Sequence, residues 1–185
     1  VKSNIDIKTF INKKFSLSEL DINTRTIEIK NLISFVRSIE DNPEIFILEK
    51  FVKKGYLIAD INLKFDQKGN IKDDFIIKGF IKDGEVKPFK KINLSKINLI
   101  FNLQNNKFEF KDINLSYDNN NLTFPELNIK KQKNKFLVSG KNNNKNLVLD
   151  NKKINQLLNI DFSNLKIKSA EFDLSNTFSF KIDNK

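Results

Sequence analysis

The feature that most constrains the fold is an alternation of apolar and polar residues with a period of two along most of the chain. In the two clearest runs the apolar positions are Leu57, Ala59, Ile61, Leu63 and Phe65, and then Ile97, Leu99, Phe101 and Leu103. A period of two places alternate side chains on opposite faces of a strand, and one apolar face with one polar face is typical of an antiparallel sheet. Short turn signals at residues 66–70, 83–84 and 104–106 separate the runs. The sequence therefore predicts a mainly β fold, built as a long antiparallel meander of hairpins.

The alternation also slips in phase at several points. Phe110 and Ile113, for example, are an odd number of positions apart. Such a slip predicts a β-bulge, and bulges bend a sheet and increase its twist. We therefore expect a strongly curved, groove-like sheet. A local echo, in which residues 60–66 recur as residues 112–118 and the core Lys-Ile-Asn-Leu occurs at 91–94 and 96–99, fits the addition of equivalent strands one after another.

Residues 31–54 depart from this pattern. Leu32, Phe35, Val36 and Ile39 have the spacing of one helix face, and Pro43 suits the first turn of a second helix, which Gly55 would end in the left-handed conformation. We expect three parts: residues 1–30 as N-terminal strands that continue a sheet, 31–54 as two short helices, and 55–185 as an antiparallel β-groove module. Because the chain starts at Val1 and contains no Met, we expect a fragment of a larger protein.

The charge is strongly positive, with a formal net charge of +10. Nucleic-acid readers rely on the planar guanidinium group, yet only Arg25 and Arg37 are arginines among 33 Lys and Arg residues. The lysines are scattered rather than gathered in a run. We attribute the excess of Lys and Asn to a coding bias on solvated surfaces, so we expect no nucleic-acid partner.

The residues that most catalysis requires are missing, since the chain has no Cys and no His. Their absence excludes thiol nucleophiles, Ser-His and Cys-His arrangements, and zinc sites built on these side chains. The five glycines are isolated and form no phosphate-binding loop. We therefore predict no catalytic residues, no metal site, no cofactor and no enzymatic activity.

Two short helices cannot cover the apolar face of so many strands. The sheet either folds on itself as a dry sandwich or barrel, or opens as a trough that holds something apolar, for which an acyl chain is the natural occupant. The lining residues predicted for such a lipid groove are Leu57, Ile61, Leu63, Phe65, Leu99, Phe101, Leu103, Phe108 and Phe110. A structural or adhesive all-β domain with a closed core is the alternative, and a nucleic-acid-binding domain is less favoured.

One succession of elements is characteristic of a known family. A short helix ending at Gly55 leads into a strand at 56–65, the Gly69 turn, a strand at 75–82 and a hairpin at 83–86, and the strands at 108–117 and 122–129 follow. This succession, over about residues 31–140, resembles the AsmA-like proteins of Gram-negative envelopes, of the TamB and YhdP type. The resemblance implies repeating β-groove modules in the periplasm, an inner-membrane anchor outside this chain, phospholipid acyl chains as the bound partner, and phospholipid transport between the inner and outer membranes.

Overall fold

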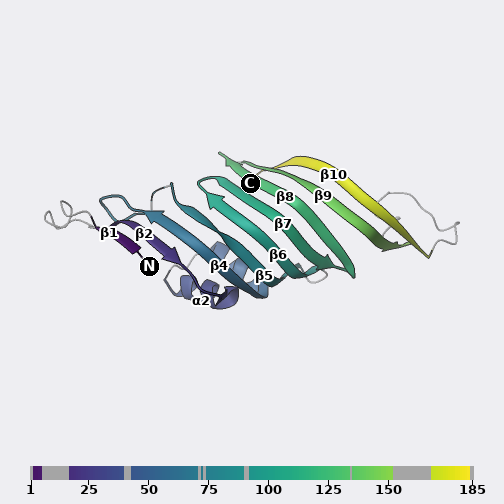
Figure 1. The fold of residues 1–185 in the computed structure, drawn as a ribbon, viewed down its shortest axis with the longest axis horizontal. Coiled ribbons are helices and arrows are strands. Elements are labelled where there is room, and N and C mark those ends of the chain that lie inside the picture. The colour runs from purple at the N-terminus through teal and green to yellow at the C-terminus, as the bar shows by residue number, and fades with distance from the viewer. Residues whose placement is uncertain are drawn as a thin grey trace.

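Every strand of the chain that the structure describes joins one antiparallel sheet (Figure 1). The computed structural model describes residues 2–5, 17–39, 43–70, 72, 74–89, 92–133, 135–151 and 168–183. Strands make up 74% of these residues. Within the described residues, nine strands follow one another across the sheet in the order β1-β2-β4-β5-β6-β7-β8-β9-β10, and the short β3 pairs with β4 beside this path.

The elements have the following bounds. The first part of the chain forms β1 (Lys2–Ile5), β2 (Leu17–Asn23), β3 (Ile27–Glu28), α2 (Ile29–Ile39) and α3 (Pro43–Phe51). The long strands are β4 (Val52–Lys64), β5 (Ile76–Phe89), β6 (Ile92–Gln104), β7 (Lys107–Tyr117), β8 (Asn120–Gln132), β9 (Lys135–Asp150) and β10 (Ser169–Asp183).

The predicted meander and the two short helices are confirmed. The strong curvature is not confirmed, because the sheet neither closes nor curls strongly. The expected role of Gly55 is wrong: α3 already ends at Phe51, and Gly55 lies inside β4 with φ 138°. A Cβ atom on Gly55 would lie 2.9 Å from the Cα atom of Gly84 and 3.0 Å from Cδ1 of Ile29, so a close approach of β4, β5 and α2 requires this glycine.

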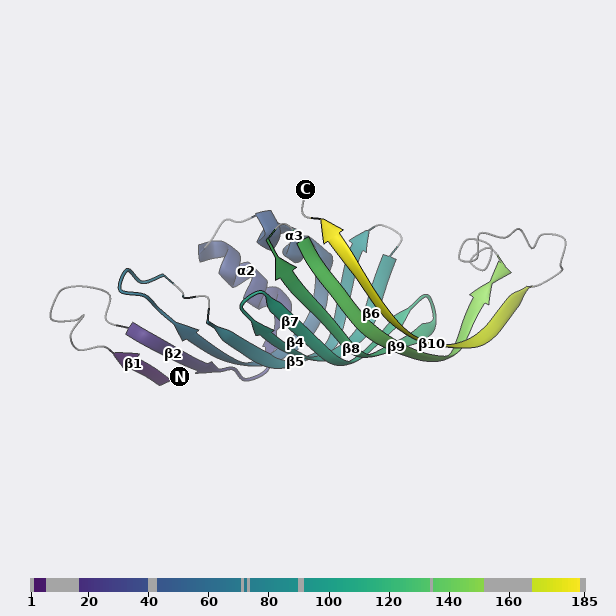
Figure 2. The same ribbon diagram turned by 90° about the horizontal axis from the view of Figure 1, so that it is seen from above.

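Both helices lie on one side of the sheet, and β9 and β10 bend along their length toward that side (Figure 2). The main contacts of α2 and α3 with the sheet are with β3, β4 and β5. An ion pair between Arg37 and Glu49 joins the two helices, and the hydroxyl of Ser34 donates a hydrogen bond to the same carboxylate at 3.2 Å. The helices therefore cover only the early part of the meander.

Residues with positive φ recur inside successive long strands. They are Gly55 in β4, Asp83 in β5, Lys96 in β6, Asp112 in β7 and Asn146 in β9. The pairing register shifts next to each of them. They are therefore bulges, and the one at Asp112 is the bulge that the phase slip between Phe110 and Ile113 predicts.

Asparagine side chains stabilise two of these bulges in the same way. Asn98 donates a hydrogen bond from Nδ2 to the backbone oxygen of Lys96 at 2.9 Å, and Asn114 donates to that of Asp112 at 3.1 Å. The residue between each pair, Ile97 or Ile113, is buried. The echoed sequence Ile-Asn-Leu is thus, in these two copies, the local signature of a bulge.

Two further asparagines replace backbone hydrogen bonds of the sheet. Asn120 accepts from the backbone nitrogen of Val148 at 2.7 Å and donates to its oxygen at 3.1 Å. Asn144 accepts from the backbone nitrogen of Thr123 at 2.5 Å. Asn120 and Asn144 are the buried polar residues of the described chain, and their amides satisfy backbone groups beyond Glu126 and Lys141, where the pairing of β8 with β9 ends. The coding-bias interpretation of Asn is therefore wrong at these positions.

Candidate functional site

An apolar hollow of about 700 Å³ lies on the helix side of the sheet. It is lined by Ile29, Leu48, Leu57, Ile77, Ile81, Phe101, Leu103, Phe108, Phe110, Ile129, Phe136, Val138 and Ile182. These residues come from α2, α3 and every strand from β4 to β10. We call this set the apolar hollow. A volume of this size falls in the ordinary range of small-molecule sites.

The strand register places these side chains on one face, because residues directly opposite each other in an antiparallel pair share a face. One cross-strand row is apolar in every strand from β4 to β10. It runs through Ile61, Ile77, Leu103, Phe108, Ile129, Val138 and Phe180. At about 4.8 Å per strand, this row is about 29 Å long. The sheet therefore presents one continuous apolar band rather than separate patches.

Small residues beside the band make room for aromatic rings. Gly79 lies opposite both Ala59 and Phe101, and Gly140 lies opposite Phe178. A Cβ atom on Gly140 would lie 2.8 Å from the Phe178 ring, so the ring packs directly on the glycine. Phe101 is only 5% exposed, because it lies between Gly79 on β5, which leaves room for its ring, and the aromatic ring of Phe110 on β7.

Helices close one end of the hollow. Within the described ranges, Ile29 at the start of α2 and Leu48 in α3 are its only lining residues outside the strands. Leu48 remains half exposed although it faces other apolar side chains, because the hollow is open there. Among the described residues, neither helix makes its main contacts with any strand from β6 to β10.

Five of the nine predicted groove residues line the hollow. They are Leu57, Phe101, Leu103, Phe108 and Phe110. Ile61 lies opposite Ile77 and Leu99 lies opposite Ile81, so both are on the face of the sheet that carries the hollow, but neither lines it. Leu63 and Phe65 lie outside the lining as well, toward the β2 side, where Leu63 pairs with Leu20.

Sequence reasoning missed the lining residues of the helices, of β5 (Ile77 and Ile81) and of the late strands β8 to β10. The period-two run of Phe136 and Val138 was a usable signal for β9, as was the alternation of Phe178, Phe180 and Ile182 for β10. No comparable signal exists for Ile29 and Leu48, since their position depends on how the helices pack against β4 and β5.

The ionisable groups with perturbed pKa values lie outside the hollow. A hydrogen bond from Lys107 Nζ, 2.7 Å from Oε1, lowers the pKa of Glu109, and Asn102 donates to the other carboxylate oxygen at 3.0 Å. Lys87 lowers the pKa of Glu85 in the same manner, with a smaller effect from Lys54. Among the described residues, the lining of the hollow therefore offers van der Waals contact and no charged group.

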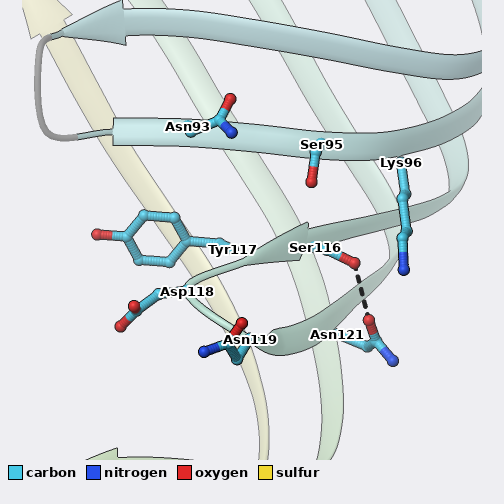
Figure 3. A pocket seen from close by; sticks show the side chains of 8 residues that line it. All are labelled: Asn93, Ser95, Lys96, Ser116, Tyr117, Asp118, Asn119 and Asn121. Atoms are coloured by element: carbon cyan, nitrogen blue, oxygen red, sulfur yellow. Dashed lines mark hydrogen bonds between the residues drawn. The ribbon is translucent and has the colours of Figure 1, made fainter.

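A second, polar hollow of about 740 Å³ lies between β6 and the β7–β8 turn (Figure 3). Its lining residues are Asn93, Ser95, Lys96, Ser116, Tyr117, Asp118, Asn119 and Asn121. The hydroxyl of Ser116 donates to Oδ1 of Asn121 at 2.8 Å, so these two side chains already satisfy each other. Among the described residues no group of three His, Cys, Asp or Glu side chains is placed to hold a metal ion.

No helix among the described elements has the length and apolar character needed to cross a membrane. In comparisons with known proteins, the chain matches no protein-family model, no curated protein and no solved structure.

Proposed function

We propose that this chain is a non-catalytic β-groove module that holds phospholipid acyl chains on its apolar face. The observation that carries the proposal is the cross-strand row that stays apolar from β4 to β10 and opens into the apolar hollow. With no ligand at this face the band is only partly covered, since five of its seven residues are half-buried and Phe180 is exposed.

The energetics favour an aliphatic occupant. Each methylene removed from water stabilises the complex by about 0.8 kcal/mol, so ten buried methylenes contribute on the order of 8 kcal/mol. The described lining residues provide no hydrogen-bonding side chain, and a buried polar group without a partner costs free energy. An acyl chain satisfies both conditions, while its polar headgroup would remain outside the hollow.

The absence of polar lining groups also supports a broad lipid preference. Headgroup recognition would require convergent polar side chains, and the part of the lining that the structure describes contains none. Bulk phospholipid is therefore the proposed cargo. In keeping with the resemblance to AsmA-like proteins, we place this module in the periplasm, as part of an inner-membrane-anchored protein that carries phospholipid between the inner and outer membranes along a curved groove.

A charged substitution inside the hollow tests the proposal against a matched substitution outside it. Leu103 is half-buried in the hollow, whereas Ile100, three positions earlier in the same strand, is 49% exposed and pairs with Phe80 and Lys111 outside the hollow. We expect L103E to abolish co-purification of phospholipid, quantified by mass spectrometry, and I100E to retain it. Circular dichroism and the urea midpoint would show that both variants are folded.

The outcomes separate the candidate functions. Equal lipid content in both variants, or no lipid in the wild-type protein, would refute the groove. If L103E unfolds while I100E does not, the apolar face belongs to a closed, dry core, as expected for a structural all-β domain. A photo-crosslinking residue at Ile129 provides a readout that does not depend on charge: lipid adducts are expected there and not at Ile100.

A further inference from the structure

The last strand of the meander, β10, forms one edge of the sheet (Figure 1). It is 15 residues long and pairs with β9 along its whole length. Among the described residues no strand pairs with its other side. The opposite edge is formed by β1, which has only four residues.

Exposed edges invite pairing with another strand, and proteins blunt them with short strands, Pro, Lys or bulges. The β1 edge is short, whereas β10 is long and carries only charged residues among these devices, namely Glu171, Asp173, Lys181 and Asp183. It contains no Pro, no Gly and no residue with positive φ, and the extra residue at the β9–β10 irregularity belongs to β9. The backbone of β10 is therefore a regular template.

The apolar face does not fade out toward this edge. Phe180 continues the apolar row from Val138, and Ile182 lies opposite Phe136 and lines the hollow. Phe180 is 48% exposed and Ile182 is 50% exposed, because the sheet ends beside them. An additional strand on this edge would cover both side chains.

For the chain of residues 1–185, we propose that the occupant of this edge is β10 of a second copy, paired antiparallel about a two-fold axis at Asn176. This register is self-complementary on the apolar face. It places Phe178 opposite Leu174, Phe180 opposite Phe172, and Ile182 opposite Ala170. Aromatic and aliphatic cross-strand pairs of this kind stabilise a sheet.

Charge complementarity selects the same register. With the axis at Asn176, Lys181 lies opposite Glu171 twice, and Asp173 and Asp183 lie opposite serines. Moving the axis to Thr177 sets Lys181 opposite Asp173 but also Asp183 opposite Glu171, so attraction and repulsion offset each other, and moving it to Phe178 sets Asp183 opposite Asp173, where like charges destabilise the pair. An axis at Ser175 gives Lys181 no acidic partner.

The pairing does not depend on what the apolar hollow binds. It would join two sheets into one through their β10 strands, with the apolar faces on the same side. An isologous contact of this kind closes at two copies, because each β10 edge is used once.

Charge reversal tests the pairing, and the double variant provides the control. In sedimentation velocity, the wild-type chain is expected to show a concentration-dependent dimer. K181E and E171K each replace two attractive pairs with two repulsive ones, so each should weaken dimerisation about tenfold or more. The double variant K181E/E171K restores opposite charges and should dimerise like the wild type. Circular dichroism checks that all three variants fold.

Cysteine crosslinking tests the register, since the chain has no native Cys. In the proposed dimer the two copies of residue 176 are direct neighbours, about 5 Å apart between Cα atoms, so N176C should form an intermolecular disulfide under mild oxidation. The T177C cysteines would lie about 8 Å apart, too far for a disulfide. A chain that stays monomeric at every soluble concentration, single reversals that dimerise normally, or T177C crosslinking as readily as N176C would overturn the proposal.

Discussion

Lys96 occupies a backbone conformation that does not suit lysine. It lies inside β6 with φ 51°, in the left-handed region, whereas Asp83, Asp112 and Asn146 occupy the equivalent bulge positions of other strands. An ordinary L-residue in this region costs roughly 1–2 kcal/mol, and Asn and Asp tolerate it better because their short polar side chains bond locally. We therefore predict that K96N stabilises the protein.

The size of the effect follows from the surroundings of Lys96. Its side chain is exposed, and the bond that Asn98 donates at 2.9 Å goes to its backbone oxygen, which the substitution keeps. Relief of part of the strain should raise the free energy of unfolding by about 0.5–1 kcal/mol. For a chain of this length, that is a rise in the melting temperature of roughly 1–4 °C.

Urea denaturation followed by circular dichroism measures this change, with K78N as the control. Lys78 is exposed in β5, and Asn is disfavoured in ordinary strand positions, so K78N should lower stability by up to about 0.5 kcal/mol. D112V should lower the free energy of unfolding, the opposite of K96N, because a β-branched residue is poorly accommodated at φ 51°. If K96N loses as much stability as K78N, backbone strain at the bulge is not what limits stability there.

Three further predictions concern packing and pH. F101A should lower the free energy of unfolding by about 3 kcal/mol, whereas F35A, at a site 63% exposed, should change it by less than about 0.5 kcal/mol; the urea midpoints compare them. G79A should cost at least about 2 kcal/mol, since the added Cβ would lie 2.0 Å from a backbone oxygen of β4, and a wild-type melting temperature would contradict this clash. The pKa of Glu109 is lowered chiefly by the hydrogen bond from Lys107, so its contribution to stability is present near neutral pH and is lost as the pH falls below about 4; E109Q should flatten this acid dependence in urea titrations at several pH values.

The alternation of apolar residues was sufficient to predict the sheet, because it depends only on neighbouring positions in the sequence. It also placed Leu57, Phe101 and Phe108 on the face that carries the hollow. It could not show where along each strand the hollow lies. That depends on the register between strands and on the cover that α2 and α3 provide, and for this reason Leu63 and Phe65 were included and Ile129 was not.

The extent to which the sheet bends could not be predicted from the sequence either. Each phase slip predicts a bulge, and the slip at Asp112 is one. A bulge changes the direction of one strand locally, but the curvature of the whole sheet depends on how bulges in neighbouring strands line up. The register shifts of the β5–β6 pair and of the β6–β7 pair both fall within residues 92–100 of β6, and even so the sheet neither closes nor curls strongly.

The asparagines show why a local motif alone does not determine a local structure. The sequence Asp-Ile-Asn-Leu occurs at residues 60–63 as well as 112–115. Asn114 bonds back to the oxygen of Asp112 and a bulge forms, whereas Asn62 donates to Glu19 and Asp21 on β2, at 2.7 and 2.6 Å, and β4 continues without one. The acceptors that the neighbouring strand presents decide whether the asparagine amide bonds back within its own strand and closes a bulge, or bridges to that neighbour. Replacing Glu19 and Asp21 would remove the acceptors on β2 that compete for Asn62. The tendency of residues 60–63 to form a bulge is therefore a property of the β2–β4 pair and not of these four residues alone.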